Sequence, residues 1–92
     1  MPGDNILTVE VTNISANGLW LLIDDAEKFL SYEDFPWFRY ASIDEILSVE
    51  RLAPHHLYWE KLDVDLHIES IDYPERYPLK AKVDRKIPAF QA

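Results

Sequence analysis

One cluster of side chains in this sequence has the residue types that bind metal ions. Its members are His55, His56, Asp63, Asp65 and His67. Imidazole and carboxylate groups suit zinc, iron or manganese, and the best set would be His56 with Asp63 and Asp65. Adjacent residues of a strand point to opposite faces, so only one of the two neighbouring histidines joins these carboxylates easily. The spacing matches no established metal motif. The simpler interpretation is a wet polar row, opposite the apolar face of a half-buried strand, and we predict no cofactor.

Adjacent carboxylates are the next candidates, because general acid–base catalysis uses paired carboxyl groups. One member of such a pair must lose enough hydration to raise its pKa. Each pair here has a structural explanation instead. Asp24-Asp25 makes a turn, Glu33-Asp34 opens a loop, and Asp44-Glu45 lies in a first helical turn, where the helix dipole favours acids. We therefore predict no catalytic residue, and an enzyme is the less favoured class.

Aromatic side chains are concentrated in residues 29–40, which hold six of the twelve in the chain. Consecutive residues around the proline of this segment diverge, so they are not all expected to point into a small core. One interpretation is core packing. The other is that Trp37, with Tyr40 or Tyr58, forms an exposed patch rimmed by Glu33-Asp34, because aromatic patches with polar rims are typical of protein interfaces. The candidate interface residues are Glu33, Asp34, Phe35, Trp37, Phe38 and Tyr40.

The elements that must position these residues follow from the hydrophobic periodicity. Residues 6–12 alternate between apolar and polar, which predicts a half-buried strand. The apolar run 19–23 predicts a central strand covered on both faces, and 27–32 returns as a third strand. Between the first two, Asn17-Gly18 is expected to supply the positive φ angles of a tight turn. These segments predict an antiparallel meander.

A helix and more strands are expected after the meander. Ser42 and Glu45 form a capping box that begins a helix over about 42–50, with Ile43, Ile46 and Leu47 as its apolar stripe. Residues 56–59 predict a fourth strand, and a brief strand to residue 65 precedes a short helix near 66–73. The predicted class is α+β: a three- to four-stranded sheet with one main helix packed on it.

Length and charge limit the classes of function. The chain has 92 residues, no cysteine and a net charge of −8, so it forms no disulfide and no thiolate site. Residues 1–75 hold sixteen acids against four bases, whereas 76–92 hold five bases against one acid. We expect one domain over 1–78 and a basic, proline-containing tail over 79–92. The acidic body disfavours nucleic acid and anionic membranes as partners. No signal peptide or membrane span is predicted, which favours the cytoplasm.

Three segments carry a family resemblance: FLSYEDFPWF (29–38), ASIDEIL (41–47) and PHHLYWEKLDVDLHIESI (54–71), after an LWLLIDD hairpin. They resemble the bacterial family known as domain of unknown function 2442, over about residues 6–78. The resemblance implies a small α+β domain. It also implies a neighbouring gene for another small protein, in an arrangement like a toxin–antitoxin pair. The family has no agreed catalytic residues, so the resemblance implies no site.

These observations predict a non-enzymatic protein-interaction module with another small, basic protein or itself as partner, and a dimer as the favoured oligomer. An antitoxin-like role is the finer form of this prediction. Two alternatives stay open. One is a small metal-dependent enzyme using His56, Asp63 and Asp65. The other is a nucleic-acid-associated regulator whose dimer pools two basic tails.

Overall fold

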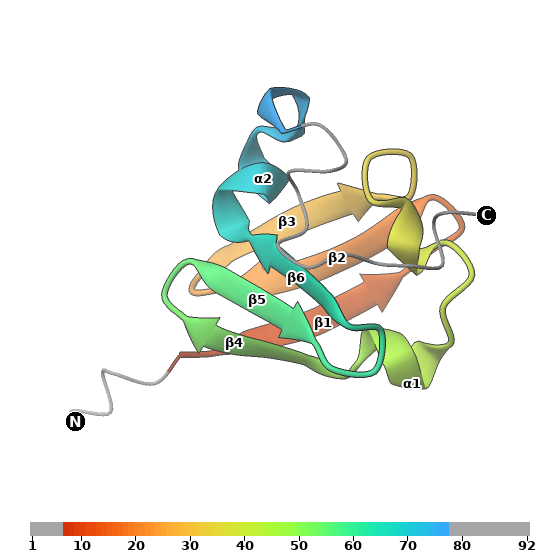
Figure 1. Cartoon of the computed structure of the whole chain (residues 1–92), viewed down its shortest axis with the longest axis horizontal. Coiled ribbons are helices and arrows are strands. Elements are labelled where there is room, and N and C mark those ends of the chain that lie inside the picture. Colours follow the sequence, from red (N-terminus) through yellow and green to blue (C-terminus); the bar gives the residue numbers. More distant parts are fainter. Residues whose placement is uncertain (1–6, 78–92) are drawn as a thin grey trace.

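Two antiparallel sheets of three strands form the protein, as the computed structural model shows for residues 7–77 (Figure 1). Both sheets are meanders, in which each strand pairs with the next along the chain. The first sheet consists of β1 (Val9–Ile14), β2 (Gly18–Ile23) and β3 (Ala26–Ser31). The second consists of β4 (Val49–Ala53), β5 (His56–Trp59) and β6 (Val64–His67). The α+β class is therefore confirmed, whereas the single sheet of three or four strands was wrong.

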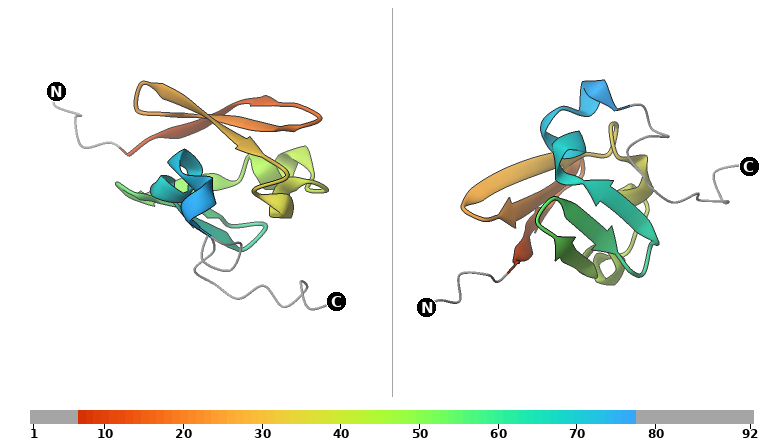
Figure 2. Two further views of the ribbon diagram at one scale, coloured as in Figure 1. Left: turned by 90° about the horizontal axis from the view of Figure 1, so that it is seen from above. Right: turned by 60° about the vertical axis from the view of Figure 1, so that its left-hand side comes forward.

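The inner faces of the two sheets meet and form the core (Figure 2). Alternate residues of the central strand β2 are buried at Leu19, Leu21 and Ile23, because successive side chains of a strand point to opposite faces. The second sheet contributes a matching inner row, which consists of Leu57 and Trp59 of β5 and of Val64 and Leu66 of β6. The central strand β2 was expected to be covered on both faces, but Trp20 and Leu22 are only half-buried.

Within residues 7–77, four short helices lie in the connections and after β6. They are η1 (Pro36–Phe38), α1 (Ile43–Ile46), α2 (Ile68–Asp72) and η2 (Pro74–Arg76). The capping box of α1 is confirmed: the Ser42 hydroxyl accepts from the Glu45 amide at 3.1 Å, and the Glu45 carboxylate accepts from the Ser42 amide at 2.9 Å. The helix ends far earlier than residue 50, however, and the chain enters β4 at Val49.

The expected apolar stripe of this helix is also wrong. Only Ile46 is buried, whereas Ile43 and Leu47 are 65% and 54% exposed. A four-residue helix makes barely one turn, so it presents one side chain to the core. The short helix predicted near 66–73 is present as α2, although β6 continues to His67 before it begins.

Gly18 has a different role from the one expected. The described residues with positive φ are Asp24 and Asp63, and Gly18 is not one of them. Instead, a Cβ atom at Gly18 would lie 2.3 Å from the Leu30 carbonyl oxygen and 2.7 Å from the ring of Phe29. Gly18 therefore permits the close approach of β3 and its aromatic ring. The predicted tail, 79–92, lies outside the described residues.

Candidate interaction surface

The aromatic segment expected to form an exposed patch lies in the core. Phe35, Trp37 and Phe38 are 1%, 8% and 0% exposed. The short turn η1 places them at one end of the space between the sheets, where the Phe38 ring packs 4.7 Å from the ring of Trp59. The expected surface patch around Trp37 was wrong, because the second sheet supplies a second apolar wall that the sequence did not indicate.

The other candidate interface residues do not form one patch. Tyr40 is 93% exposed and Glu33 is exposed, whereas Asp34 is half-buried and accepts a hydrogen bond from the Ser31 hydroxyl at 3.2 Å. Tyr58 lies in the second sheet and donates to Asp63 at 3.1 Å. Tyr40 is therefore an exposed ring beside a buried aromatic cluster.

The histidines and aspartates come together in part. Val64 and Leu66 face the core, so the alternate residues Asp65 and His67 lie on the outer side of the second sheet, whereas Asp63 lies in the turn before β6 with a φ of 55°. The His56 Nε2 atom contacts the Asp65 carboxylate. The rings of His56 and His67, which are directly opposite each other, lie 4.8 Å apart.

This arrangement does not make the predicted metal set. Asp63, the third expected ligand, accepts its hydrogen bond from Tyr58, and His55 is exposed in the turn before β5. Within residues 7–77, no group of three or more His, Asp or Glu side chains is arranged to hold a metal ion. The side chains of His56 and Asp65, which contact each other, are 26% and 17% exposed.

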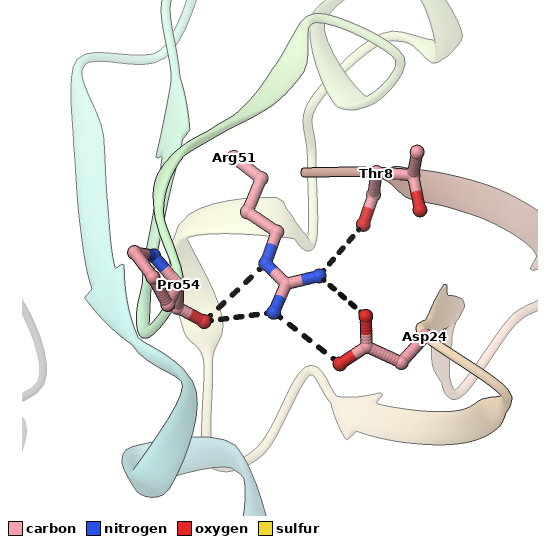
Figure 3. Close-up of polar contacts among 4 residues, drawn as sticks. All are labelled: Thr8, Asp24, Arg51 and Pro54. Atoms are coloured by element: carbon pink, nitrogen blue, oxygen red, sulfur yellow. Dashed lines mark hydrogen bonds and ion pairs between the residues drawn. The ribbon is translucent and has the colours of Figure 1, made fainter. Parts of the chain in front are cut away.

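Asp24 has a structural role that the sequence did not indicate (Figure 3). Its carboxylate accepts two hydrogen bonds from the Arg51 guanidinium, at 2.9 and 3.3 Å. The same guanidinium donates to the carbonyl oxygens of Thr8, at 3.2 Å, and Pro54, at 2.9 and 3.3 Å. The hydrogen bond from Arg51 holds the pKa of Asp24 below its ordinary value. This clamp joins the two sheets.

An apolar stripe covers the outer face of the first sheet, where no described element lies over it (Figure 2). Trp20 and Phe29 are directly opposite each other on β2 and β3, with ring centroids 5.0 Å apart. Leu22 lies on the same face, two residues from Trp20, and is opposite Glu10 on one side and Glu27 on the other. Phe29 is 39% exposed, and both glutamates are exposed. The face is thus an apolar stripe with an acidic flank.

The sequence alone does not distinguish the two faces of β2, but the pairing of its neighbouring strands does. The run of β2 is apolar at nearly every position, which hides its two faces. Glu10 of β1 and Glu27 of β3 are both paired with Leu22 of β2. Directly paired residues lie on the same face of a sheet, so Leu22 lies on the solvent-facing side with the two glutamates. Strand pairing is what separates the buried half of this run from the exposed half.

The acidic charge of the body is left largely uncompensated. Three of the four bases before residue 76 already form ion pairs within the chain: Lys28 with Asp72, Arg51 with Asp24, and Lys61 with Asp44. The hydrogen bond to Asp44 raises the pKa of Lys61 above its ordinary value. Most carboxylates therefore have no lysine or arginine of the body to pair with.

A shallow, open hollow adjoins α1 and β4. The residues that line it are Asp44, Leu47, Ser48, Val49, Glu50, Glu60 and Lys61. Because its lysine is already paired with Asp44, the hollow is acidic like the rest of the body. Across residues 7–77, no helix combines the length and the apolar character needed to cross a membrane.

Comparison with known proteins gives a family without a function. Neither the curated proteins nor the solved structures contain a match. A family model described as "Protein of unknown function (DUF2442)" matches residues 8–77, which span both sheets and α2. The chain therefore belongs to the DUF2442 family.

Proposed function

We propose that this chain is a non-enzymatic protein-interaction module that binds a basic protein through the outer face of its first sheet. The observation that carries the proposal is the uncovered stripe of Trp20, Leu22 and Phe29, flanked by Glu10 and Glu27. Aromatic side chains in an exposed apolar stripe are enriched where proteins bind one another. This face replaces the Trp37 patch as the candidate interface.

Charge favours a basic partner over a second copy. Two copies packed face to face would bring Glu10 and Glu27 of each against the same carboxylates of the other, which opposes association. A partner with Lys or Arg around an apolar centre would instead be attracted by the acidic body, and its association would be accelerated. The antitoxin-like role, with a small neighbouring-gene protein as partner, is the finer form of this proposal.

Co-expression with the adjacent gene product and affinity purification test the proposal. We expect the double variant Glu10→Lys, Glu27→Lys to lose the partner, because it reverses the flank of the stripe at two exposed positions. Trp20→Ala should also weaken capture, because it removes the largest apolar side chain of the face. Thermal denaturation of each variant, followed by circular dichroism, establishes that the fold is retained.

Matched controls use the same chemistry away from the face. Glu33→Lys with Glu60→Lys makes the same charge change at two other exposed acids, and Tyr40→Ala removes an exposed aromatic ring that lies outside the stripe. These variants should retain the partner. Failure of the wild-type chain to capture the product, or equal capture by face and control variants, would overturn the proposal.

The dimer expected from the sequence stays a prediction. Sedimentation velocity over a concentration series measures it directly. Reversible dimerisation that Trp20→Ala abolishes and Tyr40→Ala leaves intact would assign the face to a second copy and would also overturn the proposal.

A further inference from the structure

We propose that residues 79–87 of this chain occupy the outer face of the first sheet in the free protein and compete there with other proteins. The occupation of the face is independent of the function proposed above, and only the competition rests on it. The occupant is a segment of the same chain, chosen for its charge, its apolar pattern and the place where it begins.

The charge of the segment is complementary to the face. Residues 79–87 read LKAKVDRKI and hold four bases against one acid. The flank of the stripe consists of Glu10 and Glu27, and within residues 7–77 no lysine or arginine forms an ion pair with either. The basic segment and the acidic flank would therefore attract each other.

The apolar pattern of the segment is the second match. Leu79, Val83 and Ile87 recur at every fourth position, a spacing that gathers side chains on one side of a segment. The face offers Trp20, Leu22 and Phe29 as its apolar stripe. Burial of apolar side chains from both partners would add to the charge attraction.

The segment begins beside the correct edge of the sheet. Lys28 of β3 forms an ion pair with Asp72 of α2 at 2.7 Å, so α2 is held against β3. The short helix η2 follows α2 directly and contacts it, so residues 74–76 lie beside the same helix. The flanking β3 residues Glu27 and Phe29 point to the opposite face from Lys28.

Only a short length of chain is needed to pass around the edge. β3 is an edge strand of the first sheet, so no other strand separates α2 from the outer face, and each extended residue of a chain spans about 3.3–3.6 Å. A short tether also gives an effective concentration in the millimolar range, so even weak intrinsic binding would fill the face. A competing protein must displace the segment first.

The absence of cysteine makes the test direct. A nitroxide label on the single thiol of the full-length variant Ala81→Cys broadens nearby nuclear magnetic resonance signals. We expect the strongest loss at the Trp20 indole and the Phe29 amide, with weaker loss at Tyr58 on the outer face of the second sheet. The reversal Glu10→Lys with Glu27→Lys should abolish this pattern, whereas Glu33→Lys with Glu60→Lys should leave it intact.

Other occupants would give different signals. A mixture of isotope-labelled chains without nitroxide and unlabelled chains with nitroxide shows broadening only if the segment binds a second copy. Such intermolecular broadening, broadening centred on the hollow beside Asp44 and Glu50, or uniform weak broadening would each overturn the proposal.

The competition has its own measurement. Lys80→Glu with Lys82→Glu should raise the apparent affinity for the co-expressed partner by up to about tenfold, because the competent state would no longer be a minor one. An unchanged affinity would overturn the competition. If the nitroxide broadens signals on the face but no partner is captured on co-expression, the proposed function is refuted. The occupation of the face by the segment still holds in that case.

Discussion

Replacing Arg51 by methionine should remove the clamp between the two sheets. The Arg51 side chain is 7% exposed. Its guanidinium donates hydrogen bonds to three residues that are well separated along the chain: Thr8, Asp24 and Pro54. Methionine keeps most of the apolar stem, so the packing changes little. It removes every donor, so all the hydrogen bonds from this side chain are lost.

The expected cost follows from the two carbonyl oxygens. Each loses a hydrogen bond worth about 1 kcal/mol net, or roughly 2 kcal/mol for Thr8 and Pro54 together. Asp24 is 72% exposed, so its carboxylate is rehydrated in the variant and adds little to the loss. In a domain of this size 1 kcal/mol corresponds to about 4–8 °C, so Tm should fall by roughly 8–16 °C.

Thermal denaturation followed by circular dichroism measures this fall, and Arg51→Lys is the matched control. Lysine keeps the charge but cannot span three acceptors from one planar group, so its Tm should lie close to that of Arg51→Met. If Arg51→Lys retained the wild-type Tm, charge alone would hold the sheets together and the hydrogen-bond argument would be refuted.

The clamp also has a pH signature. Because the folded-state pKa of Asp24 lies below its ordinary value of 3.8, its contribution is present above that value and is lost as the pH falls below it. The variant Asp24→Asn suits this test, because asparagine tolerates the positive φ of 57° at this position. The Tm difference between wild type and Asp24→Asn should therefore be present at neutral pH and close at about pH 2–3. A difference that is equal at both pH values would contradict the assignment.

Three further predictions concern the core and the polar face. Gly18→Ala should destabilise the fold by about 1–3 kcal/mol in thermal denaturation, despite the usual gain of about 0.5–1 kcal/mol on replacing glycine in a strand. The reason is the 2.3 Å approach of the new Cβ to the Leu30 carbonyl oxygen, and a raised Tm would disprove it. Trp59→Phe should lower the urea midpoint by an amount equivalent to at least 1–3 kcal/mol, roughly the cost of leaving the buried Ile46 carbonyl without its 3.0 Å hydrogen bond; an unchanged midpoint would show that this bond contributes nothing. Titration calorimetry with zinc, manganese or iron should show no saturable heat, and a stoichiometric isotherm would revive the metal-dependent alternative.

Local sequence signals predicted the local structure well. The capping box at Ser42 and Glu45 begins α1, and the alternation around Val64 and Leu66 separates the buried and wet faces of β6. The meander of the first sheet is also as predicted. Each of these features depends on neighbours a few residues apart, whose contacts are encoded in short spacings.

Features that depend on distant segments were not predicted. The helix expected to reach residue 50 overlaps the start of β4, because Ile46 and Leu47 fit a helical period and nothing nearby marks Val49–Ala53 as a strand. Without β4 the second sheet could not be recognised, and the aromatic residues around Pro36 had no second wall to pack against.

The sequence by itself determined an acidic, cysteine-free α+β chain, the meander of its first sheet and the start of helix α1. It also determined the chain's resemblance to the DUF2442 family. Only the tertiary structure decided that Trp37 is buried, that Trp20 and Phe29 pair on the outer face of the first sheet, and that Arg51 clamps the sheets. The physical reason is that burial and long-range pairing depend on which faces meet. A run such as LWLLI has two equally apolar sides until strand register and a second sheet choose between them.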